Sequence, residues 1–129
     1  MHFFVAMEPP TKTQQEHRIG KRKDGSMYVY EDRDLKAARI KLQNKIRPFA
    51  PEVPFSGPVR LIVKWLFPKG KHKDGQYKTT KPDTDNLNKM LKDEMTRTGF
   101  WKDDALVVSE IIEKFWAEIP GIYIEVEEL

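Results

Sequence analysis

The 129-residue sequence contains no cysteine, and this absence excludes several kinds of site at once. Without a thiol there is no disulfide scaffold, no thiolate zinc centre and no cysteine nucleophile. Long apolar runs are absent as well, since none approaches the roughly 20 residues that a membrane-spanning helix needs. The apolar start, residues 1–7, is too short for the core of a signal peptide and lacks a basic beginning. We therefore expect a cytoplasmic protein that is not associated with a membrane.

The rest of the composition is that of one folded domain. Hydrophobic residues make up 39% of the chain and charged residues 33%, which is typical of globular rather than disordered proteins. The three histidines are dispersed along the chain, which argues against a histidine metal site. The length suits one domain and not two of ordinary size. We expect a single domain over residues 1–129.

Charge is unevenly distributed along the chain. Residues 1–92 hold 20 Lys and Arg against 10 Asp and Glu, whereas residues 93–129 hold 3 against 10. A strongly basic part favours an anionic partner, and a nucleic-acid backbone is the commonest large anion. The alternative is that the lysines only keep the protein soluble.

The hydrophobic pattern changes between the periods of strands and helices. The expected elements, in chain order, are a strand at 2–7, a hairpin at 18–30, a helix from Leu35 that ends before Pro48, a strand at 59–67, a helix from about 85 to 98, and strands at 105–117 and 122–127. Asp24-Gly25 suits the hairpin turn, because both residues tolerate positive φ. This order predicts an α+β fold with two main helices and a mixed or antiparallel sheet.

Apolar side chains at helical spacing mark the buried face of each expected helix. In the first helix these are Leu35, Ala38, Leu42 and Ile46, and in the second they are Leu87, Met90, Leu91 and Met95. Asp32 or Asp34 can cap the first helix. The tryptophans fall in strand or strand-edge patterns, which favours a place in the core over stacking on bases: Trp65, Trp101 and Trp116.

Residues 68–80 separate the long strand from the second helix and show no hydrophobic period. The segment contains two glycines and four lysines, so we expect an exposed and mobile loop. Its lysines, and the one just after it, suit contacts to a DNA backbone, which carry no sequence information: Lys69, Lys71, Lys73, Lys78 and Lys81. Tyr77 lies alone among them and is a candidate for stacking on an unpaired base.

Paired aspartates open the second helix. Asp83 and Asp85 would point in different directions if both were helical, since two residues span about 200° of rotation. Pro82 favours an extended chain ahead of a helix, so both carboxylates can converge if Asp83 is extended and Asp85 lies in the first turn. The alternative is structural, because Asp suits helix caps and the charges from Asp85 to Arg97 alternate at the i,i+4 spacing of a solvated face.

Two further carboxylates follow the second helix at Asp103-Asp104, where a core strand begins and no structural duty is evident. Several aspartates in a basic protein match a site for Mg²⁺, which prefers carboxylate oxygen and completes its shell with water and phosphate. At a phosphodiester the cation can activate a water and stabilise the charge on the phosphate and the leaving group. Lys89 lies one turn after Asp85, where it can bring positive charge to the same phosphate.

These motifs resemble those of the RusA family of Holliday-junction resolvases. The resemblance rests on Asp83-x-Asp85-Asn86-Leu87-x-Lys89 and on Trp101-x-Asp103-Asp104 before a valine-rich strand, and it covers about residues 55–129 well. It implies that the metal, Mg²⁺ or Mn²⁺ in its place, is held by Asp83, Asp85 and Asp104. It also implies that Lys89 is essential, while Asp103 is either a neighbour or a support for the ligands.

The resemblance further implies a bacterial or prophage enzyme of DNA recombination and repair. It implies a homodimer as well, because a four-way junction is nicked on two opposing strands. Some elements exceed the needs of one small core and leave surface for a pair: the leading strand, the hairpin, and the apolar Phe49, Phe55 and Ile62. We therefore predict a Mg²⁺-dependent, structure-selective endodeoxyribonuclease that resolves four-way junctions. The alternatives are a non-catalytic DNA-binding phage regulator with the same fold, and a nuclease that acts on flaps or forks.

Overall fold

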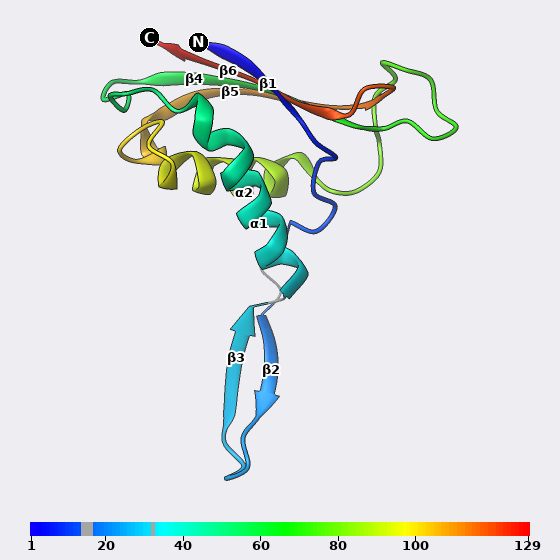
Figure 1. The fold of residues 1–129 in the computed structure, drawn as a ribbon, viewed down its shortest axis with the longest axis vertical. Coiled ribbons are helices and arrows are strands. Elements are labelled where there is room, and N and C mark those ends of the chain that lie inside the picture. The colour runs from blue at the N-terminus through cyan, green and yellow to red at the C-terminus, as the bar shows by residue number, and fades with distance from the viewer. Residues whose placement is uncertain (14–16, 32) are drawn as a thin grey trace.

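The computed structural model describes residues 1–13, 17–31 and 33–129. Its elements are β1 (His2–Ala6), β2 (His17–Lys21), β3 (Met27–Glu31), α1 (Arg33–Ile46), β4 (Val59–Pro68), α2 (Thr84–Arg97), β5 (Val107–Ala117) and β6 (Gly121–Glu128). Short 3₁₀ turns at Arg47–Phe49 and Asp104–Leu106 follow α1 and precede β5. A sheet with two helices on one face forms the body, from which a hairpin projects (Figure 1). The predicted α+β class with two main helices is confirmed.

The main sheet is mixed, with the strand order β1-β6-β4-β5. Strand β6 runs antiparallel to both β1 and β4, whereas β5 runs parallel to β4. Strand β4 alternates buried and more exposed residues along its length, as the period of two predicts. A parallel pair needs a crossover connection, and here residues 69–106 supply it with a loop, α2 and the turn before β5.

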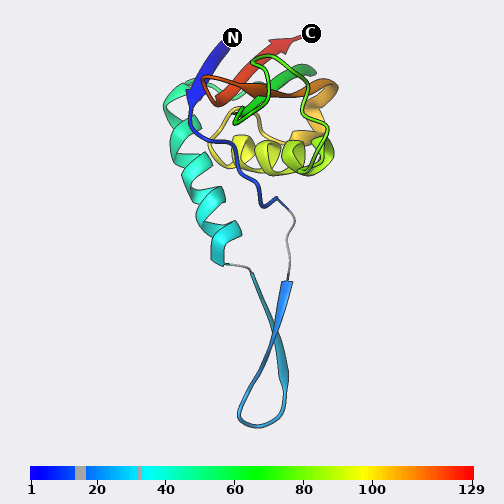
Figure 2. The same ribbon diagram turned by 90° about the vertical axis from the view of Figure 1, so that its right-hand side faces the viewer.

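Both helices cover the same face of the sheet (Figures 1 and 2). The four apolar residues predicted for the second helix are all buried in α2, and α1 buries Leu35, Leu42 and Ile46. Trp65 and Trp101 are 0% and 1% exposed, which confirms their place in the core. The third tryptophan is half-buried at its edge. Within the described residues, no helix is long and apolar enough to cross a membrane.

The hairpin turn forms where it was predicted but with a different backbone. Pairing ends at Lys21 and Met27, and of the residues between them only Gly25 has a positive φ (92°). The Asp24 carboxylate instead accepts hydrogen bonds from the N–H (2.8 Å) and the hydroxyl (2.7 Å) of Ser26, and these bonds lower its pKa. The aspartate therefore shapes the turn through its side chain. At the start of α1, Asp34 lies in the first turn, while Asp32 is outside the described residues.

The loop of residues 69–80 is mostly exposed, as predicted, but it is joined to the edge of the sheet. The N–H of Gly75 donates to the carbonyl of Trp116 (2.8 Å), and the N–H of Trp116 donates to that of Gln76 (2.8 Å). A third bond runs from the N–H of Lys78 to the carbonyl of Lys114 (3.0 Å). The loop therefore extends the sheet beyond β5 without an alternating sequence pattern. Its mobility stays a prediction.

The face of the sheet opposite the helices has no helix over it (Figure 1). Phe4 and Ile111 lie on this face and are 41% and 48% exposed. Three apolar residues were expected to leave surface for a dimer. Of these, Phe55 packs against the core, and Phe49 stacks on the ring of Phe3 with centroids 4.6 Å apart. Only Ile62 of the three lies on the uncovered face.

Gly121 provides the space in which β1 approaches β6. A Cβ at this position would lie 2.2 Å from the Phe4 ring and 2.6 Å from the carbonyl oxygen of Val5. We predict that Gly121→Ala lowers the free energy of unfolding by about 1–3 kcal/mol, because backbone and ring must move apart. Urea denaturation measures the change.

Gly57→Ala is the matched control. A Cβ at Gly57 would meet only the carboxylate end of Glu128, at 3.1 Å, and this flexible group can move aside. The control is expected to stay within about 0.5 kcal/mol of the wild type. Equal losses in the two variants would contradict the packing argument.

Candidate active site

Asp83 ends the loop and Asp85 lies in the first turn of α2, as predicted. Asp83 has an extended backbone (φ −73°, ψ 149°) at the N-cap position of the helix. Its carbonyl accepts the N–H of Leu87 at 3.1 Å. The chain therefore changes from extended to helical at Asp83, so the two aspartates avoid the rotation of about 200° that separates helical residues two apart.

Capping does not occupy these two carboxylates. The side chain of Asp83 makes no capping hydrogen bond although it stands at the N-cap. Asp85 Oδ1 accepts the N–H of the adjacent Asn86 at 2.9 Å, and both aspartates are exposed. The N-terminus of a helix favours negative charge. Both groups therefore remain accessible to a ligand.

The second aspartate pair is placed by the buried end of α2. Gly99, with φ 90°, follows the helix, and the Trp101 indole N–H then donates to Thr96 Oγ1 at 2.8 Å. After this anchor the chain turns through Asp103 and Asp104 into β5. The buried tryptophan therefore fixes where the two carboxylates emerge beside α2.

The two neighbours have different duties. Asp103 Oδ1 accepts the N–H of Ala105 at 2.9 Å and so caps the 3₁₀ turn before β5. The expectation that this pair has no structural duty was therefore wrong for Asp103. Asp104 is half-buried, and within the described chain no hydrogen bond or ion pair engages its carboxylate. Of the two, Asp104 is the one available to a ligand.

Lys89 of α2 interacts electrostatically with two acids, Asp93 on the same helix and Asp104 after it. Its ammonium is 2.8 Å from Asp93 Oδ1, and its side chain is 69% exposed. The hydrogen bond and charge of Asp93 raise the pKa of Lys89, and the charge of Asp104 adds to this effect. The alternating charge series is confirmed for Lys89 and Asp93, whereas Arg97 pairs with Glu94. Lys89 is thus held protonated beside the aspartates.

Lys114, on the helix-facing side of β5, is a site residue that the sequence analysis missed. Its Nζ donates to the carbonyl oxygens of Thr80 and Pro82, both at 2.7 Å. Both acceptors lie within the last three residues before Asp83, so one side chain holds the backbone that leads into the site. The alternation of the strand could have indicated this residue, because Lys114 lies two positions before the partly buried Trp116 and therefore on the same face.

Glu110 joins the same face of β5 to α2. Its Oε2 accepts a hydrogen bond from Asn88 Nδ2 (2.7 Å), and its Oε1 accepts one from Lys92 Nζ (2.6 Å). Asn88 is only 5% exposed, and its Oδ1 has no partner among the described residues. The Glu110 carboxylate on the strand therefore binds α2 about one turn after Asp85. A glutamate in a strand gave no sequence signal for this contact.

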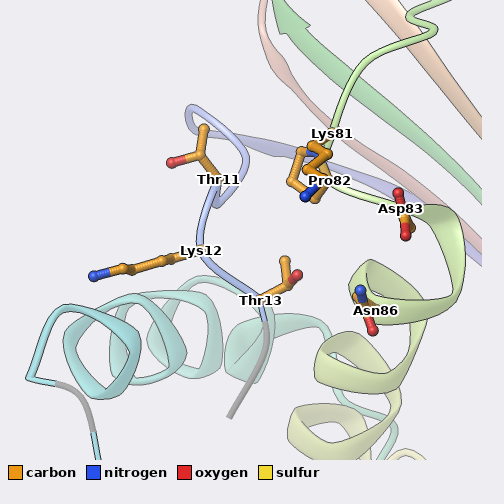
Figure 3. Close-up of a pocket in the computed structure, with 7 residues that line it drawn as sticks. All are labelled: Thr11, Lys12, Thr13, Lys81, Pro82, Asp83 and Asn86. Carbon is orange, nitrogen blue, oxygen red and sulfur yellow. The ribbon is translucent and has the colours of Figure 1, made fainter. Parts of the chain in front are cut away.

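A pocket of about 170 Å³ lies beside Asp83 (Figure 3). Its walls are the N-terminal residues 11–13 on one side and, on the other, Lys81, Pro82, Asp83 and Asn86. Lys12 points away from the pocket toward α1 (Figure 3), where its ammonium lies 3.6 Å from Asp34 Oδ2. A second cavity of about 390 Å³ shares Thr13 and Asn86 with the first and is also lined by Lys89. Polar hollows therefore run along the N-terminal half of α2.

Among the residues that the structure describes, no three His, Asp or Glu side chains are gathered closely enough to hold a metal ion. Asp83, Asp85 and Asp104 thus do not form a closed cage of ligands. They do share the chemistry of a hard-cation site, since all offer carboxylate oxygen and none forms an ion pair within the described chain. Mg²⁺ keeps several waters and takes substrate phosphate, so it does not need a full protein shell. Metal binding by these residues stays a prediction.

The lysines expected to contact DNA differ in exposure. Lys71, Lys73 and Lys81 are exposed and Lys69 is half-buried. Lys78 is only 8% exposed, which corrects the expectation that its side chain lies free in the loop.

The ammonium of Lys78 lies 4.2 Å from the ring centre of Trp116 and donates to Thr80 Oγ1 at 2.5 Å. Burial, followed by the charge of Lys114, lowers the pKa of Lys78. A cation over an indole face is stabilised by the ring electrons. Lys78 therefore packs the loop onto β5.

Tyr77 is not isolated in the loop. It is 62% exposed, but its ring stacks on Phe115 with centroids 4.8 Å apart, and its hydroxyl donates to Glu113 Oε2 at 3.0 Å. This bond and the charge of Glu113 raise the pKa of Tyr77. Stacking of Tyr77 on a DNA base stays a prediction.

Comparisons with known proteins agree with the motifs. A family model described as "Endodeoxyribonuclease RusA" matches residues 8–127. A "Crossover junction endodeoxyribonuclease rusA" from Lactococcus phage r1t is 33% identical over 132 residues, which covers 98% of this chain and 97% of that protein. A relative from Bacillus subtilis (strain 168), "Uncharacterized protein YqaN", is 33% identical over 91 residues, or 61% of this chain and 63% of its own length. The family match includes both aspartate pairs.

The hold of Lys114 on the loop is testable by substitution. We predict that Lys114→Met lowers the free energy of unfolding by about 1–3 kcal/mol, since hydrogen bonds to a charged group are lost and carbonyls are left partly unsatisfied. Amide hydrogen exchange in residues 80–86 should become faster. Lys114→Arg keeps a charged donor and should retain part of the protection. Lys102→Met is the control, because Lys102 is exposed; unchanged exchange in residues 80–86 of Lys114→Met would contradict the predicted hold.

Proposed function

Because the chain belongs to the RusA endodeoxyribonuclease family, we propose that it is a divalent-metal-dependent endonuclease that resolves four-way DNA junctions in recombination and repair. The observation that carries the proposal is the arrangement of two exposed aspartates at the start of α2 and the half-buried Asp104 before β5, all without ion partners in the described chain. The name of the relative from Lactococcus phage r1t refers to crossover junctions. This name supports junctions over flaps or forks as the substrate.

Asp83, Asp85 and Asp104 are the residues that would hold Mg²⁺, or Mn²⁺ in its place. When bound, such a cation activates water and neutralises charge that develops on the cleaved phosphate. Asp103 lies outside this set because the N–H of Ala105 engages its carboxylate. Lys114 orients the chain just before Asp83, since it binds the carbonyls of Thr80 and Pro82.

Lys89 supplies positive charge from the chain itself. Its raised pKa keeps it protonated, and it lines the cavity that adjoins the pocket of Asp83. A fixed cation beside a phosphate in the transition state stabilises the extra negative charge more strongly than it does the ground state. Lys89 therefore acts on the same phosphate as the metal.

The exposed lysines in the loop and just after it bind the DNA backbone on either side of the cleaved phosphate. Lys71, Lys73 and Lys81 are exposed, and such contacts fix the position of DNA without reading its sequence. The half-buried Lys69 adds to this set, while Lys78 keeps the loop in place through its contact with Trp116.

A homodimer follows from the need for two cuts within one lifetime of the complex. The chain has one set of the three aspartates, and a two-fold pair presents two sites with the symmetry of an opened junction. The uncovered face of the sheet supports such a pair, because Phe4 and Ile111 are exposed there. Lys64 and Glu113 are cross-strand neighbours on the same face, so it carries charges of both signs and can match its own copy.

The proposed function is tested with a plasmid that extrudes a cruciform. In Mg²⁺ we expect mostly linear product from paired nicks, and light scattering should give twice the mass of the 15.2 kDa chain. A monomer that yields mainly nicked circles would overturn both the dimer and the resolving role. Equal cleavage of flaps and forks would favour a broader nuclease, and junction binding without cleavage would favour a regulator.

The metal residues are tested by neutral, isosteric substitutions. Asp83→Asn, Asp85→Asn and Asp104→Asn are each expected to reduce cleavage by at least about 100-fold, since a ligand or a charge at the reacting phosphate is lost. Junction binding in EDTA should be unchanged or tighter, because a negative charge near phosphate is removed. Asp103→Asn is the control and should stay within a few-fold, because Asn also caps. Near-wild-type turnover in one of the first three would remove that residue from the site.

Lys89→Ala extends the same test and is compared with Asp93→Asn, which breaks the ion pair but leaves the lysine. A catalytic lysine predicts a large loss of cleavage in the first variant only. A lysine that belongs only to the surface series predicts a loss of a few tenths of a kcal/mol of stability in both. Because the pKa of Lys89 is raised above 10.5, its charge is present at all lower pH and is lost only as pH rises through that raised value.

The lysine loop is tested by changing Lys69, Lys71 and Lys73 to Ala together. We expect weaker binding to junction and duplex alike, and a slope of log affinity against log salt that is flatter by up to about 0.9 for each lost phosphate contact. A charge-matched variant of α1, in which Lys36, Lys41 and Lys45 are changed to Ala, serves as control. An unchanged slope in the loop variant would mean that the loop lysines only make the protein soluble.

A further inference from the structure

The hairpin of β2 and β3, residues 17–31, stands away from the body as a lone ribbon (Figures 1 and 2). Its two strands form a sheet of their own, and among the described strands they pair with each other alone. Each strand has five residues, so at about 3.3 Å per residue the paired part is roughly 17 Å long. An isolated two-stranded hairpin is at best marginally stable in water. A surface of this kind points to a partner that covers it.

Described residues that flank this ribbon, the β2–β3 ribbon, line the pocket of Asp83 or contact its lining. Thr13, which precedes β2, lines the same pocket as Asp83. On the other side, α1 begins just after β3, and Asp34 in its first turn lies 3.6 Å from the ammonium of Lys12. DNA with a phosphate at Asp83 therefore passes close to the base of the ribbon.

The tip of the ribbon is basic. Lys21, Arg22 and Lys23 follow one another, and Asp24 is the only acid in residues 17–30. All three basic side chains are exposed, while the Asp24 carboxylate is engaged by Ser26. The point farthest from the body thus carries uncompensated positive charge. This charge favours an anionic partner and opposes a second copy of the same tip.

One side of the ribbon carries an ordered stack of arginine on tyrosine. The guanidinium carbon of Arg22 lies 4.9 Å from the ring centre of Tyr28. The Tyr28 ring covers Gly20, its cross-strand partner, where a Cβ would come within 2.4 Å of the ring. The Arg22 Nη1 also donates to Ser26 Oγ at 3.5 Å, and the other N–H groups of the stacked guanidinium can donate to phosphate. Gly20 and Tyr28 therefore hold Arg22 ready for a backbone contact.

The other side of the ribbon carries exposed apolar side chains next to Lys21. Ile19 and Met27 are 65% and 68% exposed. A two-stranded ribbon fits the major groove of DNA, where apolar side chains can contact base edges such as the thymine methyl group. Basic residues at the tip and apolar residues along one side suit that groove better than they suit water.

We propose that the β2–β3 ribbon is a DNA-binding arm that lies in the major groove of the duplex flanking the cleaved phosphate. Lys21, Arg22 and Lys23 contact phosphates beyond the reach of the body, and Ile19 and Met27 face the base edges. The proposal rests on the proposed function for the placement of DNA at Asp83. At 3.4 Å per base pair, a ribbon of roughly 17 Å extends the contact by about five base pairs.

The test uses two charge-matched triple variants in EDTA, so that no cleavage occurs. The tip variant carries Lys21→Ala, Arg22→Ala and Lys23→Ala, and the helix variant carries Lys36→Ala, Lys41→Ala and Lys45→Ala. Hydroxyl-radical footprints are measured on a long-armed four-way junction and on a linear duplex. Salt slopes, thermal midpoints and light-scattering masses are measured for the same proteins.

We expect the tip variant alone to lose about five base pairs of protection, and its salt slope to flatten by roughly 2–3. Its thermal midpoint should not change, because the tip is exposed and apart from the core. Equal footprints for wild type and tip variant would overturn the proposal. So would a change of oligomeric mass with an unchanged salt slope, which would make the ribbon an assembly element between copies.

Failure of the proposed function gives a different result. If the wild type neither prefers nor cuts junctions, the resolving role is lost, while the footprints on the linear duplex still decide the role of the ribbon. If the wild type cuts junctions and the tip variant keeps the full footprint, the function stands and the arm does not.

Discussion

The parallel pairing of β4 with β5 is the constraint on which the candidate site depends. Parallel neighbours cannot be joined by a tight turn, so the chain leaves the end of β4, crosses the helix-covered face and returns to the start of β5. The lysine loop, α2 and the turn at Asp103-Asp104 all lie in this crossover. The apolar stripe of α2 is buried in the same core as the strands, which fixes the helix whose two ends carry the aspartate pairs.

Features with a local cause could be predicted from the sequence. The period of α2, the alternation of β4 and the extended backbone of Asp83 each follow from residues within a few positions. Contacts between distant residues could not be predicted in this way. A lysine in a loop has the same local pattern whether it is solvated or packed over an indole, as Lys78 is. The motifs thus named the candidate site residues, but not Lys114 and Glu110, which hold the site from β5.

The uneven charge of the chain has a simple structural outcome. Several acids of the C-terminal third are engaged within the protein: Glu94 by Arg97, Glu110 by Lys92, and Glu127 by Arg60 at 3.7 Å. These pairs neutralise part of the negative charge where it lies. The exposed lysines of the loop and the basic tip of the ribbon are left without such pairs, and under the proposed function they would set the field that attracts DNA and raises the rate of association.

Asp83 and Asp104 are set apart from these acids by having no ion partner in the described chain. Like charges placed near one another repel, so a fold that keeps them free is less stable than one that pairs them. The N-terminus of α2 offsets part of this repulsion at Asp83, and Lys89 offsets part of it at Asp104. A cation that binds only the folded state would remove the remainder and stabilise the fold as its concentration rises. The acids that pair within the fold are thus distinct from Asp83 and Asp104, for which we propose the role of metal ligands.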